Sequence, residues 1–204
     1  MNTNTTKRAK LNPADFRPVV KIFGKDYKLP YYTSKLADAV KQETIEYDIR
    51  RVIDTAYPGI KRPECHMLYL HMINSTRKHQ GKPVLPTSRE ITLSGQKFQV
   101  AFDDIIPVVK LEHEVDGIKY VFKQPSMVEI LEMAPGFDAM LRASIDYIEK
   151  DGVEYDMHED ASFPYELALH VEEIQGTIQL VLKSGETVTG LERIQELFLH
   201  GKFL

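Results

Sequence analysis

The chain has 204 residues, a formal net charge of −4 and one cysteine, Cys65. Its length suits one domain, or a core with a small appendage, and a hydrophobic fraction of 43% allows a sizeable core. The mildly acidic balance argues against a dedicated nucleic-acid-binding protein, a single cysteine excludes an intramolecular disulfide, and no apolar run approaches the roughly 20 residues that span a bilayer. We therefore expect a soluble protein of a reducing compartment, the cytoplasm.

The first 18 residues are polar and basic and are interrupted by two prolines. Their basic residues are Lys7, Arg8, Lys10 and Arg17. This composition predicts a mobile basic arm over residues 1–18. Two interpretations stay open, a docking tail for an acidic surface and a plain disordered terminus. The apolar segments 19–23 and 27–29 flank Gly24-Lys25-Asp26 and predict a short hairpin.

A pair of amphipathic helices is predicted between residues 33 and 80. Thr33 or Ser34 can cap the first helix, whose apolar residues recur at helical spacing until the turn sequence at 57–59. Pro63 suits the first turn of the second helix, which ends near residue 80. Two helices joined by a short turn would pack as a helical hairpin and cover one face of a sheet.

The segment 89–124 has the strongest local pattern in the chain. Apolar and polar residues alternate on both sides of Ser94-Gly95 and of Asp116-Gly117, as in half-buried strands. Asp-Gly is a strong hairpin signal because both central residues of the tight mirror-image turn need a positive φ. We expect two antiparallel hairpins that share one apolar face and form a small sheet.

The half of the chain over 126–204 is predicted to be acidic and mainly helical. Ser126 can cap a helix that stops at 134–136. The spacing of apolar residues predicts a second helix over 137–148, and residues 153–164 read as a loop.

The last forty residues give weaker signals. Residues 165–174 fit either helix or strand, and their content of Glu and Leu favours helix. Residues 178–188 fit either a late hairpin or a helix that stops early. Residues 191–199 fit an amphipathic helix that Gly201 stops. The fold predicted for 19–204 is therefore a single α+β domain, in which amphipathic helices pack on a small antiparallel sheet of hairpins.

Charge is unevenly distributed along the chain. Between residues 129 and 173 thirteen residues are acidic, and only Arg142 and Lys150 are basic. An acidic half and a basic arm can steer assembly with charged partners or close on each other. The candidate partner-docking residues, besides the basic residues of the arm, are Glu154, Asp156, Glu159 and Asp160. A plain solvated face is the competing interpretation, since surface ion pairs contribute little to stability.

Patterns typical of metal binding or catalysis are incomplete. Cys65 and His66 would point about 100° apart on a helix, and His71 follows His66 by five residues, so the imidazoles do not share a face. A nuclease-like cluster would need carboxylates around one cation. Its possible members are Asp103, Asp104, Glu112, Glu114, Asp116 and Lys119. Only two of them, Glu112 and Glu114, are expected on one strand face.

The apolar context that follows Cys65, from Met67 to Met72, favours burial over nucleophilic catalysis. We predict no catalytic residue, no metal ligand and no cofactor-binding residue.

Several short motifs, taken in order, carry a resemblance to a known family. They are 25–30 (KDYKLP), 50–55 (RRVIDT), 67–74 (MLYLHMIN), 102–105 (FDDI) and 116–126 (DGIKYVFKQPS). This order resembles that of the small baseplate-hub and tail-assembly proteins of T4-type contractile-tailed bacteriophages, over residues 25–174. In that family a strand ending in a Tyr/Gln-Pro-Ser step precedes an acidic helical half. Some relatives carry a cysteine pair between the sheet strands. Residues 90–102 of this chain contain no cysteine, so the resemblance implies no metal-linked role here.

The resemblance implies a structural or chaperone-like protein that helps to assemble a phage baseplate hub through protein–protein contacts. It implies no enzymatic activity and no cofactor. The implied partners are other hub or tail proteins, with the tape-measure protein as one candidate, and the implied location is the host cytoplasm during assembly, or the virion tail if the protein is retained.

Two alternatives from other classes stay open. One is a small metal-dependent, nuclease-like phage enzyme that uses Glu112 and Glu114. The other is a nucleic-acid-binding accessory protein that uses the basic arm.

Overall fold

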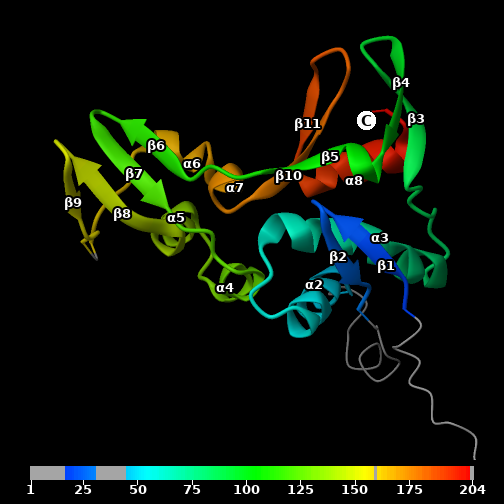
Figure 1. Ribbon diagram of the computed structural model, residues 1–204, viewed down its shortest axis with the longest axis horizontal. Coiled ribbons are helices and arrows are strands. Elements are labelled where there is room, and N and C mark those ends of the chain that lie inside the picture. The colour runs from blue at the N-terminus through cyan, green and yellow to red at the C-terminus, as the bar shows by residue number, and fades with distance from the viewer. Residues whose placement is uncertain (1–16, 31–44, 159, 203–204) are drawn as a thin grey trace, which may run out of the picture.

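The computed structural model describes residues 17–30, 45–158 and 160–202, and within these ranges it has two lobes of unequal size (Figure 1). Helices and small antiparallel sheets occur together, so the predicted α+β class is confirmed. The buried apolar residues fall into two separate clusters, one in each lobe. No helix in the described ranges has the length and apolar character that crossing a membrane requires.

The large lobe collects segments from both ends of the chain and from its middle. Its helices are α2 (Ile45–Ala56), α3 (Arg62–His79), α4 (Met127–Glu132) and α8 (Leu191–His200), with the short 3-10 helix η3 (Phe102–Asp104). Its strands are β1 (Val19–Ile22), β2 (Lys25–Lys28), β3 (Ser88–Leu93), β4 (Gln96–Ala101), β5 (Ile105–Val108), β10 (Thr177–Val181) and β11 (Thr187–Thr189). They form two hairpins, β1–β2 and β3–β4, and one sheet in the order β11–β10–β5.

The small lobe is a four-stranded sheet covered by short helices. Its strands, in the spatial order β6–β7–β8–β9, are β6 (Glu112–Val115), β7 (Ile118–Phe122), β8 (Ile145–Lys150) and β9 (Val153–Tyr155). Its helices are α5 (Phe137–Ser144), α6 (Tyr165–Ala168) and α7 (Val171–Ile174). Leu141, Leu167 and Ile174 of these helices are buried with Tyr120 and Phe122 of β7.

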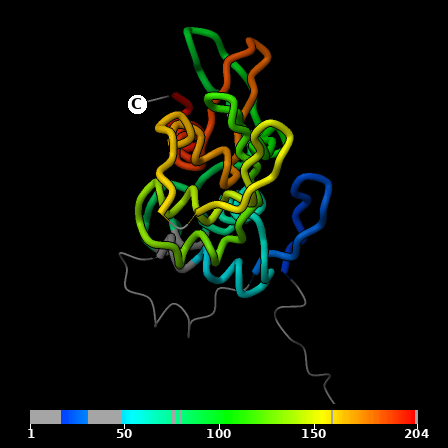
Figure 2. The backbone as a smooth tube through the Cα atoms, turned by 90° about the vertical axis from the view of Figure 1, so that its left-hand side faces the viewer, coloured from blue at the N-terminus to red at the C-terminus, as the bar shows by residue number. Residues whose placement is uncertain are grey.

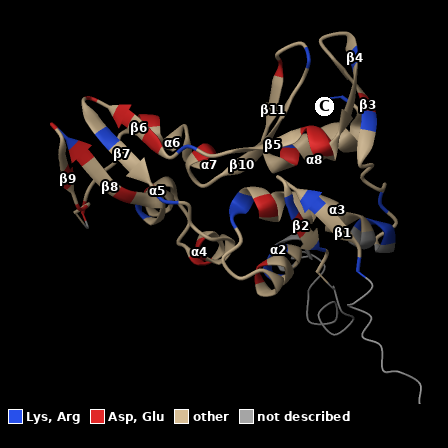
Figure 3. Ribbon diagram, viewed as in Figure 1, with Lys and Arg blue, Asp and Glu red and all other residues tan. Residues whose placement is uncertain are grey.

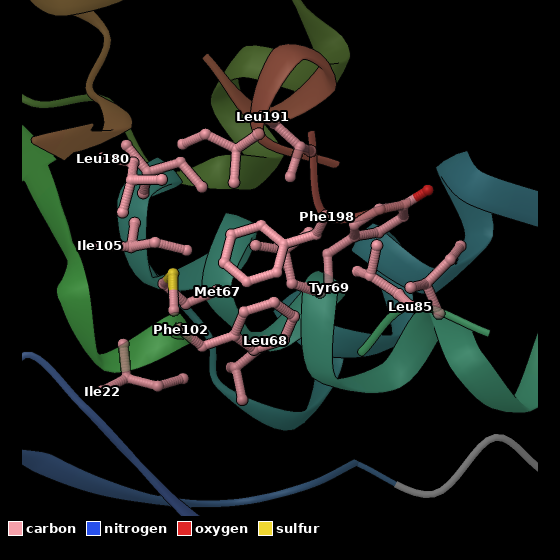
Figure 4. Packing of buried hydrophobic residues seen from close by; sticks show 14 of the residues in the cluster. Ile22, Met67, Leu68, Tyr69, Leu85, Phe102, Ile105, Leu180, Leu191 and Phe198 are labelled. Atoms are coloured by element: carbon pink, nitrogen blue, oxygen red, sulfur yellow. The ribbon is translucent and has the colours of Figure 1, made fainter. Parts of the chain in front are cut away.

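Helix α3 is the centre of the large lobe. It is buried on nearly every side, which marks a helix surrounded by other elements rather than one with a single apolar stripe. Its buried residues are Cys65, His66, Met67, Leu68, Tyr69, Leu70, Met72 and Ile73. Figure 4 shows residues of α3 packed with Phe102, Ile105, Leu180 and Phe198, which come from three other parts of the sequence.

Helix α8 begins after Gly190 and is followed by Gly201, whose φ of 72° allows its amide to donate to Leu197 O at 2.8 Å, as the predicted stop requires. Arg89 of β3 ties α8 to the lobe by donating from Nη1 to Phe198 O at 2.8 Å. The β3–β4 hairpin and the loop between β10 and β11 project from the same end of the molecule (Figure 2), where Ser94 Oγ donates to Glu186 Oε1 at 2.6 Å.

The predicted hairpins at Ser94-Gly95 and Asp116-Gly117 are confirmed. Both turns have positive φ at their two central residues, 48° and 78° in the first and 52° and 73° in the second, as the mirror-image turn requires. The first hairpin of the chain is also present, but it turns at Phe23-Gly24, so Lys25 and Asp26 belong to β2.

The expectation that the two hairpins of 89–124 share one sheet is wrong. β3–β4 lies in the large lobe, and β6–β7 belongs to the small-lobe sheet. Between them, β5 pairs with β10, more than seventy residues later in the chain, and β7 pairs with β8. Local alternation predicts a strand and its turn, but it carries no information on a partner that is distant in sequence.

The helix predicted over 137–148 stops at Ser144, and residues from Ile145 onward form β8. Ile145 and Ile148 are three residues apart, which matches helical spacing. In the strand both face the core because the register shifts between Val121 and Phe122 of β7. This shift reproduces a helical spacing within a strand, so the sequence pattern was misleading.

Part of the predicted loop 153–164 is also a strand, since Val153 to Tyr155 form β9 against β8. The residues from 126 to 204 are therefore mixed, and "mainly helical" is corrected. The predicted helix after Ser126 is confirmed, with a capping box in which the Ser126 amide donates to Glu129 Oε2 at 2.6 Å. Residues 165–174 contain the two short helices α6 and α7, separated by a turn, and 178–188 form the late hairpin. The predicted first-helix cap at Thr33 or Ser34 lies outside the described residues, as do residues 1–16.

A narrow neck joins the lobes where Gly176 meets two distant segments. A Cβ at Gly176 would lie 3.0 Å from both Pro63 Cδ and Gln124 Nε2. The Gln124 side chain donates to Ile174 O at 3.1 Å, and Arg62 Nη1 donates to Gln175 Oε1 at 3.0 Å. The neck therefore depends on a residue without a side chain at position 176, which also has a φ of 88°.

We predict that Gly176→Ala lowers the free energy of unfolding by about 1–3 kcal/mol more than Gly152→Ala does, because only the first places a methyl group against packed atoms. Gly152 is the matched control, with a φ of 77° and no atom within 4 Å of an added Cβ. Urea denaturation of both variants measures the difference. Equal losses for the two variants would contradict the packing of the neck.

Candidate functional site

The outer face of the small-lobe sheet carries a ladder of charged residues, which we call the acidic face. The pairing register places Glu114, Lys119, Glu149 and Glu154 side by side across the four strands. The adjacent row on the same face contains Glu112, Val121 and Tyr147. Cross-strand partners project from the same side of a sheet. Four carboxylates and one ammonium group therefore lie on the same face of the sheet.

Lys119 lies in the middle of the acidic face. Its Nζ is 2.9 Å from Glu112 Oε2 and 3.8 Å from Glu149 Oε2. The hydrogen bond and negative charge of Glu112 raise the pKa of Lys119, and Glu149 adds to the effect. Glu114 and Glu154 have no ion-pair partner in the described part of the chain. Lys119 thus leaves most of the negative charge of the face uncompensated.

The other face of this sheet is covered. Tyr120, Phe122 and Ile148 project there and pack against the helices of the lobe. On the acidic face, in contrast, the side chains of Glu112 and Lys119 are 65% and 37% exposed. Figure 3 shows the acidic residues gathered on β6, β8 and β9, away from the large lobe. In the described structure the acidic face has no element packed on it.

Strand β9 is the edge of the sheet next to this face. It pairs with β8 alone among the described strands, and its three residues are exposed. Val153 and Tyr155 have exposed fractions of 50% and 49%. An exposed edge strand with apolar side chains offers unpaired backbone groups and apolar contact to a partner chain.

The predicted docking residues are only partly brought together. Glu154 lies on the acidic face, Asp156 follows β9, and Asp160 is exposed near His158. Lys7, Arg8, Lys10 and Glu159 lie outside the described residues. Arg17 has a local role, because its guanidinium donates to Leu29 O at 3.2 Å and to Pro30 O at 2.5 Å.

Two members of the acidic face, Glu112 and Glu114, were considered from sequence only as nuclease-like ligands. The structure confirms that they share a strand face. It separates them from Asp103 and Asp104, which lie in η3 of the large lobe, and Asp104 accepts a hydrogen bond from the Ala101 amide at 2.7 Å. The cluster drawn from sequence is therefore not formed. No group of three or more potential metal-ligating His, Cys, Asp or Glu residues occurs within the described ranges.

The burial expected for Cys65 is confirmed, with an exposed fraction of 0%. Burial raises the pKa of the Cys65 thiol to about 12. At neutral pH the group is a thiol rather than a thiolate, and the thiolate is the nucleophile. Cys65 is therefore a packing residue of α3.

We predict that Cys65 in the folded protein reacts with DTNB at least about a hundredfold more slowly than in the denatured chain, because both access and thiolate fraction are low. Following the absorbance of the released thiolate at mildly alkaline pH measures both rates. Since the chain has one cysteine, the signal reports on this residue alone. A rapid stoichiometric reaction of the folded protein would contradict the burial.

Comparisons of the chain with protein-family models, with curated proteins and with solved structures found no match. The acidic face and the edge strand beside it are therefore the observations from which a function is inferred.

Proposed function

We propose that this chain is an assembly protein without catalytic activity that binds a basic surface of a partner protein through its acidic face. The observation that carries the proposal is that four glutamates share one face of the small-lobe sheet with Lys119, and that no described element covers this face. Such a surface attracts a basic partner over a distance and aligns it before contact.

The acidic face also carries apolar side chains that support stable contact as well as attraction. Val121 and Tyr147 are half-buried there, in the same row as Glu112 and next to the row of Lys119 and Glu149. An aromatic and an aliphatic side chain inside a polar rim are typical of the centre of a protein interface. The exposed edge β9 adds a place where a partner strand can extend the sheet.

The resemblance of the sequence to T4-type baseplate-hub and tail-assembly proteins supplies the setting. In this proposal the chain acts as a structural or chaperone-like protein while a phage baseplate hub forms. Its partners are other hub or tail proteins, including the tape-measure protein as one candidate, and no cofactor takes part.

We predict that co-expression with the other hub proteins of the same genome yields a complex that survives size-exclusion chromatography. Glu114→Lys combined with Glu154→Lys should weaken this complex by about tenfold or more, because neither residue has an ion pair with a described residue and charge reversal turns attraction into repulsion. Titration of the purified partner, at low and at high salt, measures the loss. Wild-type binding should weaken with added salt because exposed charges are screened.

The matched control is Asp26→Lys combined with Asp103→Lys. Both residues are exposed in the large lobe, and the change in net charge is the same. Equal weakening by the two double variants would contradict the acidic face as the binding surface. A protein that elutes alone with every hub protein would contradict the baseplate setting.

A further inference from the structure

A separate cavity lies where α2, α3, α7 and the start of α8 meet. Its volume is about 460 Å³, and its lining is unusually rich in arginine. Arg50 comes from α2, Arg62 from α3 and Arg193 from α8. Two carboxylates, Glu172 and Glu192, line it as well. This cavity is distinct from the acidic face. Its arginines favour a negatively charged ligand, whereas the acidic face favours a basic one.

The three guanidinium groups have donors to spare. Arg62 gives one hydrogen bond to Gln175, and Glu172 acts on it only as a nearby charge. The Nε atom of Arg50 is buried without a hydrogen-bond partner, while its guanidinium carbon lies 5.5 Å from the centre of the Tyr69 ring. Arg193 is exposed, and no described residue pairs with it. The three arginines therefore line one cavity, and none of them forms an ion pair with a carboxylate of the described residues.

The first turn of α8 adds backbone donors to the same cavity. Gly190 precedes the ten-residue helix, and no side chain caps it. Gly190, Leu191, Glu192 and Arg193 all line the cavity. The open amides at a helix N-terminus, together with the helix dipole, favour a negatively charged group.

His66 is an independent observation that points to a ligand. It is 2% exposed and lines the cavity, and its Nδ1 atom is buried without a hydrogen-bond partner. Burial, with the positive charges of Arg62 and Arg50, holds the pKa of His66 well below its usual value. Buried polar atoms are normally hydrogen-bonded, and no described residue bonds to this nitrogen beside the cavity.

We propose that this cavity binds the phosphate group of a small hydroxylated molecule, such as a sugar phosphate. The planar guanidinium fork matches phosphate oxygens, and the amides of α8 complete the set of donors. The volume exceeds what a free phosphate needs and falls in the range of small-molecule sites. Glu172 and Glu192 accept hydrogen bonds from hydroxyl groups of the same ligand. The proposal is independent of the acidic face.

Isothermal titration calorimetry with three probes tests the proposal: ribose 5-phosphate, inorganic phosphate and ribose. Ribose 5-phosphate is expected to bind more tightly than inorganic phosphate, and ribose alone is expected not to bind. Arg50→Gln and Arg193→Gln should each weaken the binding of ribose 5-phosphate by about tenfold, since each removes a charge-assisted hydrogen bond.

The matched control is Arg51→Gln. Arg51 is the neighbour of Arg50 on α2, but its guanidinium lies 3.7 Å from Glu132 of α4, so this variant should bind like the wild type. Because Arg193 is exposed, its variant keeps the test valid even if Arg50→Gln fails to fold. Equal affinity for inorganic phosphate and ribose 5-phosphate would overturn the assignment to a hydroxylated ligand. The absence of binding by either phosphate, or equal weakening by Arg51→Gln, would overturn the site itself.

Discussion

The close approach of three chain segments at Gly176 holds the two lobes in their relative position. A Cβ there would meet Pro63 and Gln124 at 3.0 Å, so glycine lets the backbone between α7 and β10 pass these two residues without displacing them. The hydrogen bonds of Gln124 to Ile174 O and of Arg62 to Gln175 lie at the same point. Helix α7 lies directly before this contact, and its residue Glu172 lines the arginine cavity.

The two surfaces proposed as binding sites have opposite charge and belong to different parts of the fold. The acidic face is built on four neighbouring strands of the small lobe, where register alone brings its glutamates together. The cavity is built where helices from distant segments converge, and its arginines come from three different helices. Arg62 lines the cavity and also donates a hydrogen bond to Gln175 in the neck, so the cavity and the neck share this residue.

Features encoded over a few residues were predictable from sequence. The turns at Ser94-Gly95 and Asp116-Gly117, the cap at Ser126 and the helix stop at Gly201 all depend on local backbone preferences, and the structure has them where the sequence placed them. The strand from Ile145 was missed because a register shift in β7 lets residues at helical spacing face the core. Among the residues of the acidic face, the density of negative charge in the sequence identified Glu154 as a docking residue. Glu112 and Glu114 were considered only as ligands of a nuclease-like metal site.

The sequence by itself determined the α+β class, the hairpin turns, the caps and the excess of negative charge in the C-terminal half, because each follows from composition or from the conformational preferences of adjacent residues. Only the tertiary structure decided that β5 pairs with β10, that Glu114, Lys119, Glu149 and Glu154 form one row, and that Arg50, Arg62 and Arg193 line one cavity. These outcomes depend on contacts between residues far apart in the chain. Local patterns do not distinguish between the possible partners of a strand or helix, and packing and backbone pairing select one of them.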